Sequence, residues 1–189
     1  MKAVIFDLDG TLVNTIDDLA AATNQALEMH GYPAKPLADF PLMVGNGIRK
    51  LLERALGEAC TPDVLDAVQR DFLEIYDQNC MNLSAPYTGM EEVVQRLKTD
   101  GWRLMVVTNK PQAQAEKIAR RYFGDDTFVS IYGNLEGRPA KPDPLTAHMA
   151  MKDAGSTGLS VTPMSMYRRR TMPACAASAL YGDSVERTS

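Results

Sequence analysis

The composition of this 189-residue chain is typical of a soluble globular protein, with 45% hydrophobic and 23% charged residues. A formal net charge of −4 argues against nucleic acid or an anionic membrane as a partner. The three cysteines form no CxxC or Cys/His cluster, so we expect reduced thiols in a cytoplasmic protein. We expect no signal peptide, and no stretch approaches the roughly 20 apolar residues of a membrane span.

The first apolar run, residues 3–6, is typical of a strand that is buried on both faces. Asp7 and Asp9 follow it directly, and Gly10 permits a sharp turn. Both carboxylates should therefore lie at the carboxyl end of the strand, where open α/β sheets bind their ligands. On its own an Asp-x-Asp before glycine is more often a surface turn; its place directly after a strand favours a functional site.

Helical patterns dominate the next seventy residues, and a connector rich in proline interrupts them after the first pattern. No strand pattern occurs between Asn14 and Ala85, so an all-helical block follows the first strand. The helical periods cover residues 15–31, 48–57 and 65–76.

Strands and helices alternate beyond Gly89. This rhythm predicts a parallel sheet with helices on both faces. The second expected strand ends at Thr108, Asn109 and Lys110, with Thr108 and Asn109 at the tip of the strand expected next in the fold. The expected strands cover residues 103–107 and 128–132, and the expected helices cover 93–101, 111–123 and 145–154.

The string from Phe6 to Thr11, Phe-Asp-Leu-Asp-Gly-Thr, resembles the opening motif of the haloacid dehalogenase-like hydrolases, in the form of their phosphatase branch. Thr108-Asn109 matches the second motif of that family. Lys141, in a proline-rich loop before a helix, matches the third.

The resemblance implies an α/β fold with a Rossmann-like parallel sheet core and an inserted α-helical cap. The core would comprise residues 1–14 and 86–155, and the cap residues 15–85. Gly45-Asn46-Gly47 and the helix that follows resemble the cap of the phosphoglycolate phosphatase-like subfamily. These glycines suit either backbone contact with an anion or an ordinary helix start.

Phosphoryl transfer needs a nucleophile, a cation and a proton donor for the leaving oxygen. Asp7 fits the nucleophile, because a carboxylate can form an aspartyl-phosphate, and Asp9 fits the general acid and base. The resemblance implies that both also bind Mg²⁺, Asp7 through its side chain and Asp9 through its carbonyl oxygen. It further implies that Thr108, Asn109 and Lys141 hold the phosphate.

Each of these residues also has an ordinary interpretation. Thr108-Asn109 alone would be a turn or helix cap, and a lone Lys141 would be a surface charge. We interpret Lys110 as a solvated neighbour of the motif. Arg49 is a possible reader of a substrate carboxylate, and a solvated helix charge is the simpler interpretation.

The resemblance stops near Gly155. The family has a further strand that ends in acids completing the Mg²⁺ site, whereas no Asp or Glu occurs here between Asp153 and Asp183. We therefore expect an atypical tail, residues 156–189, that replaces the last core elements, as a shifted reading frame would. The core would then be incomplete, with an unpaired sheet edge.

The predicted function is a Mg²⁺-dependent phosphomonoester hydrolase that acts on a small phosphorylated metabolite such as 2-phosphoglycolate. Two alternatives stay open: a catalytically impaired or silent relative without the C-terminal acids, and another metabolite phosphatase or a phosphosugar mutase. The expected oligomeric state is a monomer or a weak homodimer.

Overall fold

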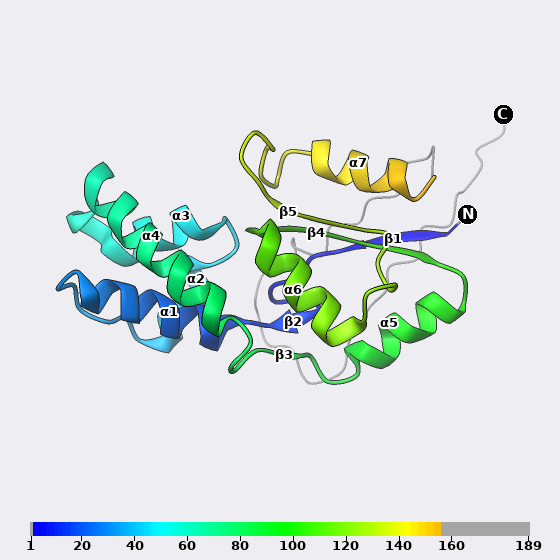
Figure 1. The fold of residues 1–189 in the computed structure, drawn as a ribbon, viewed down its shortest axis with the longest axis horizontal. Helices are drawn as coiled ribbons and strands as arrows, with labels where there is room; N and C mark the ends of the chain where they lie inside the picture. The colour runs from blue at the N-terminus through cyan, green and yellow to red at the C-terminus, as the bar shows by residue number, and fades with distance from the viewer. Residues whose placement is uncertain (1, 156–189) are drawn as a thin grey trace, which may run out of the picture.

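A computed structural model describes residues 2–155, which fold into a sheet part and a helical part (Figure 1). Among these residues no helix is long and apolar enough to cross a membrane. The strands are β1 (Ala3–Phe6), β2 (Val13–Asn14), β3 (Ala85–Pro86), β4 (Arg103–Pro111) and β5 (Ser130–Asn134). The helices are α1 (Ile16–Met29), α2 (Phe40–Met43), α3 (Ile48–Leu56), α4 (Pro62–Asn79), α5 (Met90–Thr99), α6 (Gln112–Phe123) and α7 (Leu145–Asp153), with 3₁₀ turns at Leu37–Asp39 and Gly57–Ala59.

The sheet part is built on three parallel strands in the order β1-β4-β5. Helix α7 covers one face of this sheet, and α5 and α6 cover the other (Figure 1). The central strand β4 is buried from Leu104 to Lys110, as expected of a strand with helices on both faces. The predicted α/β fold with a parallel sheet is therefore confirmed, and the carboxyl ends of β1 and β4 meet at one edge.

Helices α1 to α4 form the helical part, which lies beside that edge of the sheet (Figure 1). Helix α4 packs against α1 and α3, and its buried Phe72 and Tyr76 stack at 5.3 Å between ring centroids. The two connections to the sheet part run side by side as the short antiparallel pair β2 and β3. Both ends of the helical part are thus tied together where they enter the sheet part.

Three strand boundaries differ from the prediction: the end of β4, and both ends of β5, which runs from Ser130 to Asn134. Strand β4 continues past Val107 to Pro111, across an irregularity in its pairing with β5. Strand β5 begins at Ser130, because Phe128 packs edge-on against Phe123 of α6, at 5.7 Å between ring centroids. Apolar packing of Phe128 against a helix gives the same sequence signal as a strand, which explains the shift.

Strand β1 pairs with β4 alone within residues 2–155. The expectation of an atypical C-terminal tail concerns residues 156–189, which lie outside the described part. It therefore stays a prediction.

Candidate active site

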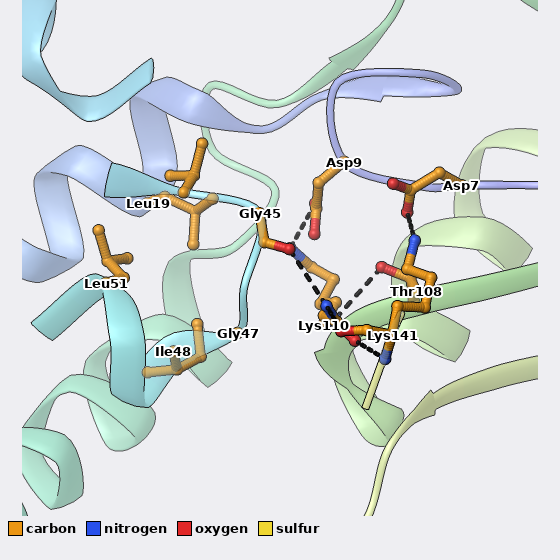
Figure 2. A pocket seen from close by; sticks show the side chains of 12 residues that line it. Asp7, Asp9, Leu19, Gly45, Gly47, Ile48, Leu51, Thr108, Lys110 and Lys141 are labelled. Carbon is orange, nitrogen blue, oxygen red and sulfur yellow. Dashed lines mark hydrogen bonds and ion pairs between the residues drawn. The ribbon is translucent and has the colours of Figure 1, made fainter. Parts of the chain in front are cut away.

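All five predicted site residues line one small cavity between the sheet and helical parts, of about 50 Å³. Its floor comes from the strand ends and from the loop before α7, and its roof comes from the helical part (Figure 2). The floor residues are Asp7, Asp9, Thr108, Asn109, Lys110 and Lys141, and the roof residues are Leu19, Val44, Gly45, Gly47, Ile48 and Leu51.

Asp7 follows β1 directly and is anchored through one carboxylate oxygen. Its Oδ1 accepts hydrogen bonds from Lys141 Nζ and from the backbone N–H of Leu8, both at 2.8 Å. No described contact engages Oδ2. Burial raises the pKa of Asp7 above its usual value, and the neighbouring Lys141 opposes that rise. One oxygen is thus fixed while the other is open to a reacting group.

Asp9, two residues further along the chain, is likewise hydrogen-bonded through one carboxylate oxygen. Its Oδ1 accepts from the hydroxyl of Thr15 at 2.7 Å and from Lys110 Nζ at 2.8 Å. No hydrogen bond or ion pair of its Oδ2 is found among the described residues. Figure 2 shows the Asp7–Lys141 and Asp9–Lys110 pairs beside each other.

The interpretation of Lys110 as a solvated residue is wrong. Lys110 is only 3% exposed, and its Nζ donates to Tyr76 Oη at 2.6 Å as well as to Asp9. The ammonium also lies 4.8 Å from the centroid of the Tyr76 ring. Burial raises the pKa of Tyr76 well above its usual value, so the phenol stays protonated and neutral. A lysine so deeply buried requires a charged partner, and Asp9 supplies one.

Asn109 joins three segments of the chain through its side-chain amide. Its Nδ2 donates to the carbonyl oxygens of Gly45 and Lys141, at 3.1 and 3.2 Å, and its Oδ1 accepts from Lys141 N–H at 2.8 Å. The neighbouring Thr108 is buried, and its hydroxyl accepts from Lys110 N–H at 3.2 Å. In this conformation Asn109 positions Lys141 and the roof loop; phosphate binding by Thr108 and Asn109 stays a prediction.

The roof of the cavity carries no charged side chain among the residues that line it. Arg49, the possible carboxylate reader, instead pairs with Asp66 of α4 at 2.7 Å, and its side chain is 51% exposed. The simpler interpretation of Arg49 as a solvated helix charge agrees with this geometry.

A family model for the haloacid dehalogenase-like hydrolases matches residues 1–162. The chain belongs to this family. The match ends close to Gly155, the predicted end of the resemblance, and the predicted membership is confirmed.

Curated relatives of this hydrolase are phosphoglycolate phosphatases. One from Cereibacter sphaeroides is 35% identical over 147 residues, which cover 76% of this chain and 67% of the relative. One from Caulobacter vibrioides is 39% identical and covers 74% of this chain and 60% of the relative. The crystal structure of a predicted phosphoglycolate phosphatase from Haemophilus somnus 129PT superposes with a TM-score of 0.75 at 31% identity, covering 82% of this chain and 72% of that one.

The donors at the strand ends fit the Mg²⁺ that the family implies. Asp7 offers an open carboxylate oxygen, and oxygen ligands suit an ion that keeps several waters. The described residues contain no group of three or more His, Cys, Asp or Glu side chains that could hold a metal. Within the described part of the chain, Asp7 and the Asp9 carbonyl would hold a Mg²⁺ ion together with phosphate and water oxygens.

Proposed function

We propose that this hydrolase is a Mg²⁺-dependent phosphatase of small phosphate monoesters that acts through an aspartyl-phosphate on Asp7. The observation that supports it is the pair of anchored carboxylates: Asp7 and Asp9 each present one open oxygen to the same cavity, and each is charge-paired with a lysine. The family membership and the phosphatases among its relatives support the same class of reaction.

The proposed reaction has two displacements at phosphorus. Asp7 Oδ2 attacks and the ester P–O bond breaks; Asp9, which must first gain a proton from water on its Oδ2, gives that proton to the leaving alkoxide. Asp9, now ionised, takes a proton from water, which attacks the phosphorus and releases phosphate and free Asp7. Lys141 holds Asp7 beside the anionic substrate and offsets their repulsion, at 2.8 Å from the Asp7 carboxylate. Bound Mg²⁺ would supply further positive charge toward the phosphate oxygens.

The cavity favours a small substrate. Its roof is apolar at Leu19, Ile48 and Leu51, and its volume of about 50 Å³ is small for a ligand pocket. We propose 2-phosphoglycolate as the first substrate to test, on the strength of the relatives' activity. Its carboxylate would have to use backbone N–H groups of the Gly45–Gly47 loop, because both cavity lysines already pair with aspartates.

The test is Mg²⁺-dependent phosphate release from 2-phosphoglycolate, an aryl phosphate and a phosphosugar. Asp7→Asn should abolish release, whereas the exposed control Asp66→Asn should retain it. A wild-type rate equal to that of Asp7→Asn on every substrate would instead establish the silent relative. Interconversion of phosphosugar isomers without net release would establish a mutase.

A further inference from the structure

We infer that Lys110 is a positioning residue that couples Asp9 to helix α4 through Tyr76. The inference rests on the proposed function, because it concerns the residue assigned as general acid and base. It extends that function, because Asp9 is then correctly oriented only while the helical part packs against the sheet part.

The coupling consists of two consecutive contacts of one ammonium group. Lys110 Nζ donates to Asp9 Oδ1 at 2.8 Å on the sheet side and to Tyr76 Oη at 2.6 Å on the helical side. The Lys110 side chain is 1% exposed and Tyr76 is fully buried, so water does not compete for the bond between them, whereas the Asp9 carboxylate is 26% exposed. Asp9 and Tyr76 therefore share one donor, and displacement of Tyr76 alters the hydrogen bonding of Asp9.

The backbone of Lys110 is fixed by close packing against strand β5. A Cβ atom built on Gly133 of β5 would come within 2.8 Å of the Lys110 carbonyl oxygen and 2.6 Å of Gln112 Cα. The close approach of β5 fixes the backbone from which the lysine side chain extends. On the other side of Asp9, Thr15 donates to the same Oδ1, so the two donors orient the carboxylate and leave Oδ2 open.

Tyr76 is equally fixed to the helical part. Its ring stacks on Phe72, one turn earlier in α4, at 5.3 Å between centroids. The C-terminal turn of α4 also contacts the sheet part at Asp77, whose carboxylate accepts from Gln114 and whose carbonyl oxygen accepts from Lys117. Tyr76 thus moves with α4 as a unit, and its contact with Lys110 exists only while α4 lies against the sheet part.

The experiment is a double-mutant cycle on the full chain, with kcat and KM measured for the best substrate of the panel above. Lys110→Met should lower kcat about a hundredfold with little change in KM, since a small misplacement of a reacting group has an effect of that size. Tyr76→Phe keeps the ring and removes the oxygen, and should lower kcat about fivefold. In the Lys110→Met background the same change should alter kcat by less than about twofold, because the phenol acts only through the lysine.

Two matched controls separate positioning from general destabilisation. Lys50→Met removes a lysine that pairs with Glu53 within α3, and Tyr132→Phe removes a hydroxyl that donates to Asp153 within the sheet part. Neither touches Asp9, so kcat should change by less than about twofold in each. Thermal unfolding of every variant checks that folded protein is compared.

The remaining outcomes overturn the inference in distinguishable ways. If kcat of the double variant falls by the product of the two single-variant factors, Lys110 and Tyr76 act independently and the coupling is absent. A rise in KM at constant kcat in Lys110→Met shows that the lysine holds phosphate and does not position Asp9. In both cases the proposed function stands. A wild-type rate no higher than that of Asp7→Asn overturns the proposed function and this inference together.

Discussion

The carboxylate of Asp18 accepts hydrogen bonds from both the backbone N–H and the hydroxyl of Ser84, at 2.7 and 2.6 Å. Asp18 lies in the first turn of α1, whereas Ser84 directly precedes β3, so the pair joins the entry of the helical part to its exit. Both residues are buried, and Leu83 N–H is a further donor to Asp18. Tyr122 of α6 donates to the Ser84 carbonyl oxygen at 2.5 Å, which fixes this junction to the sheet part.

Replacement of Asp18 by alanine should therefore destabilise the whole fold. The change leaves the buried N–H and hydroxyl of Ser84 without an acceptor, and we expect the free energy of unfolding to fall by about 2–4 kcal/mol. The neighbouring Asp17→Ala serves as the control, with an expected loss below about 1 kcal/mol. Urea denaturation of both variants measures the difference; equal losses would show that the Asp18–Ser84 contact contributes little.

Asp7→Asn should raise the melting temperature of the metal-free protein at pH 7. Burial holds the pKa of Asp7 above its usual value, so the unfolded chain releases this proton at a lower pH than the folded protein does. Stability therefore falls as pH rises from the unfolded pKa through the folded one, and ionised Asp7 destabilises the fold at neutral pH. We expect a gain of about 2–5 °C in EDTA buffer for the variant, measured by calorimetry.

Added Mg²⁺ should stabilise the wild type and not the Asp7→Asn variant. It should raise the melting temperature of the wild type by mass action and leave Asp7→Asn nearly unchanged. If Asp7→Asn melted below the wild type in EDTA, the predicted gain in stability would be wrong. The ion pair between Lys141 and ionised Asp7 would then stabilise the fold by more than burial of the Asp7 charge destabilises it.

Arg49→Met should leave kcat/KM within about twofold of the wild type, because Arg49 pairs with exposed Asp66 outside the cavity. Arg54→Met is the matched change on the same helix. Arg54 donates to the Met43 carbonyl oxygen at 2.6 Å and to Asn46 Oδ1 at 2.7 Å, and so braces the roof loop. Its loss should raise KM about fivefold or more by loosening that loop. A larger rise in KM for Arg49→Met than for Arg54→Met would show that Arg49 contacts the substrate.

The three strands of the parallel sheet and the longer helices were predictable because each carries a local signal, whereas β2, β3 and α2 are too short to carry one. The apolar run before Asp7 and the helical period of α1 need no knowledge of distant contacts. The placement of Asp7 and Asp9 beside Thr108 follows from one rule, that parallel strands meet at their carboxyl ends. The structure places these strand-end residues in one cavity, as this rule predicts.

The role of Lys110 was not predictable in the same way. Its burial depends on where α4 docks, and its partner Tyr76 lies 34 positions earlier on a helix whose period indicates only that the ring is buried. The bond from Asn109 to Gly45 likewise depends on the position of the roof loop over the sheet. Local patterns determine which face of an element is buried, whereas packing between the two parts determines which polar groups meet inside.

Gly133→Ala should destabilise the protein and lower its activity together. A Cβ at this position would lie 2.6 Å from Gln112 Cα and 2.8 Å from the Lys110 carbonyl oxygen, and neither backbone atom can move freely. Overpacking of this kind costs about 1–3 kcal/mol, and the displaced Lys110 would carry Asp9 out of position. Ser130→Ala on the same strand is the control: the Ser130 hydroxyl is buried without a hydrogen-bond partner among the described residues, so its removal should leave stability unchanged or improved. Urea denaturation and kcat, measured on both variants, test the pair. Full activity in a destabilised Gly133→Ala protein would show that Asp9 does not depend on the backbone position of Lys110.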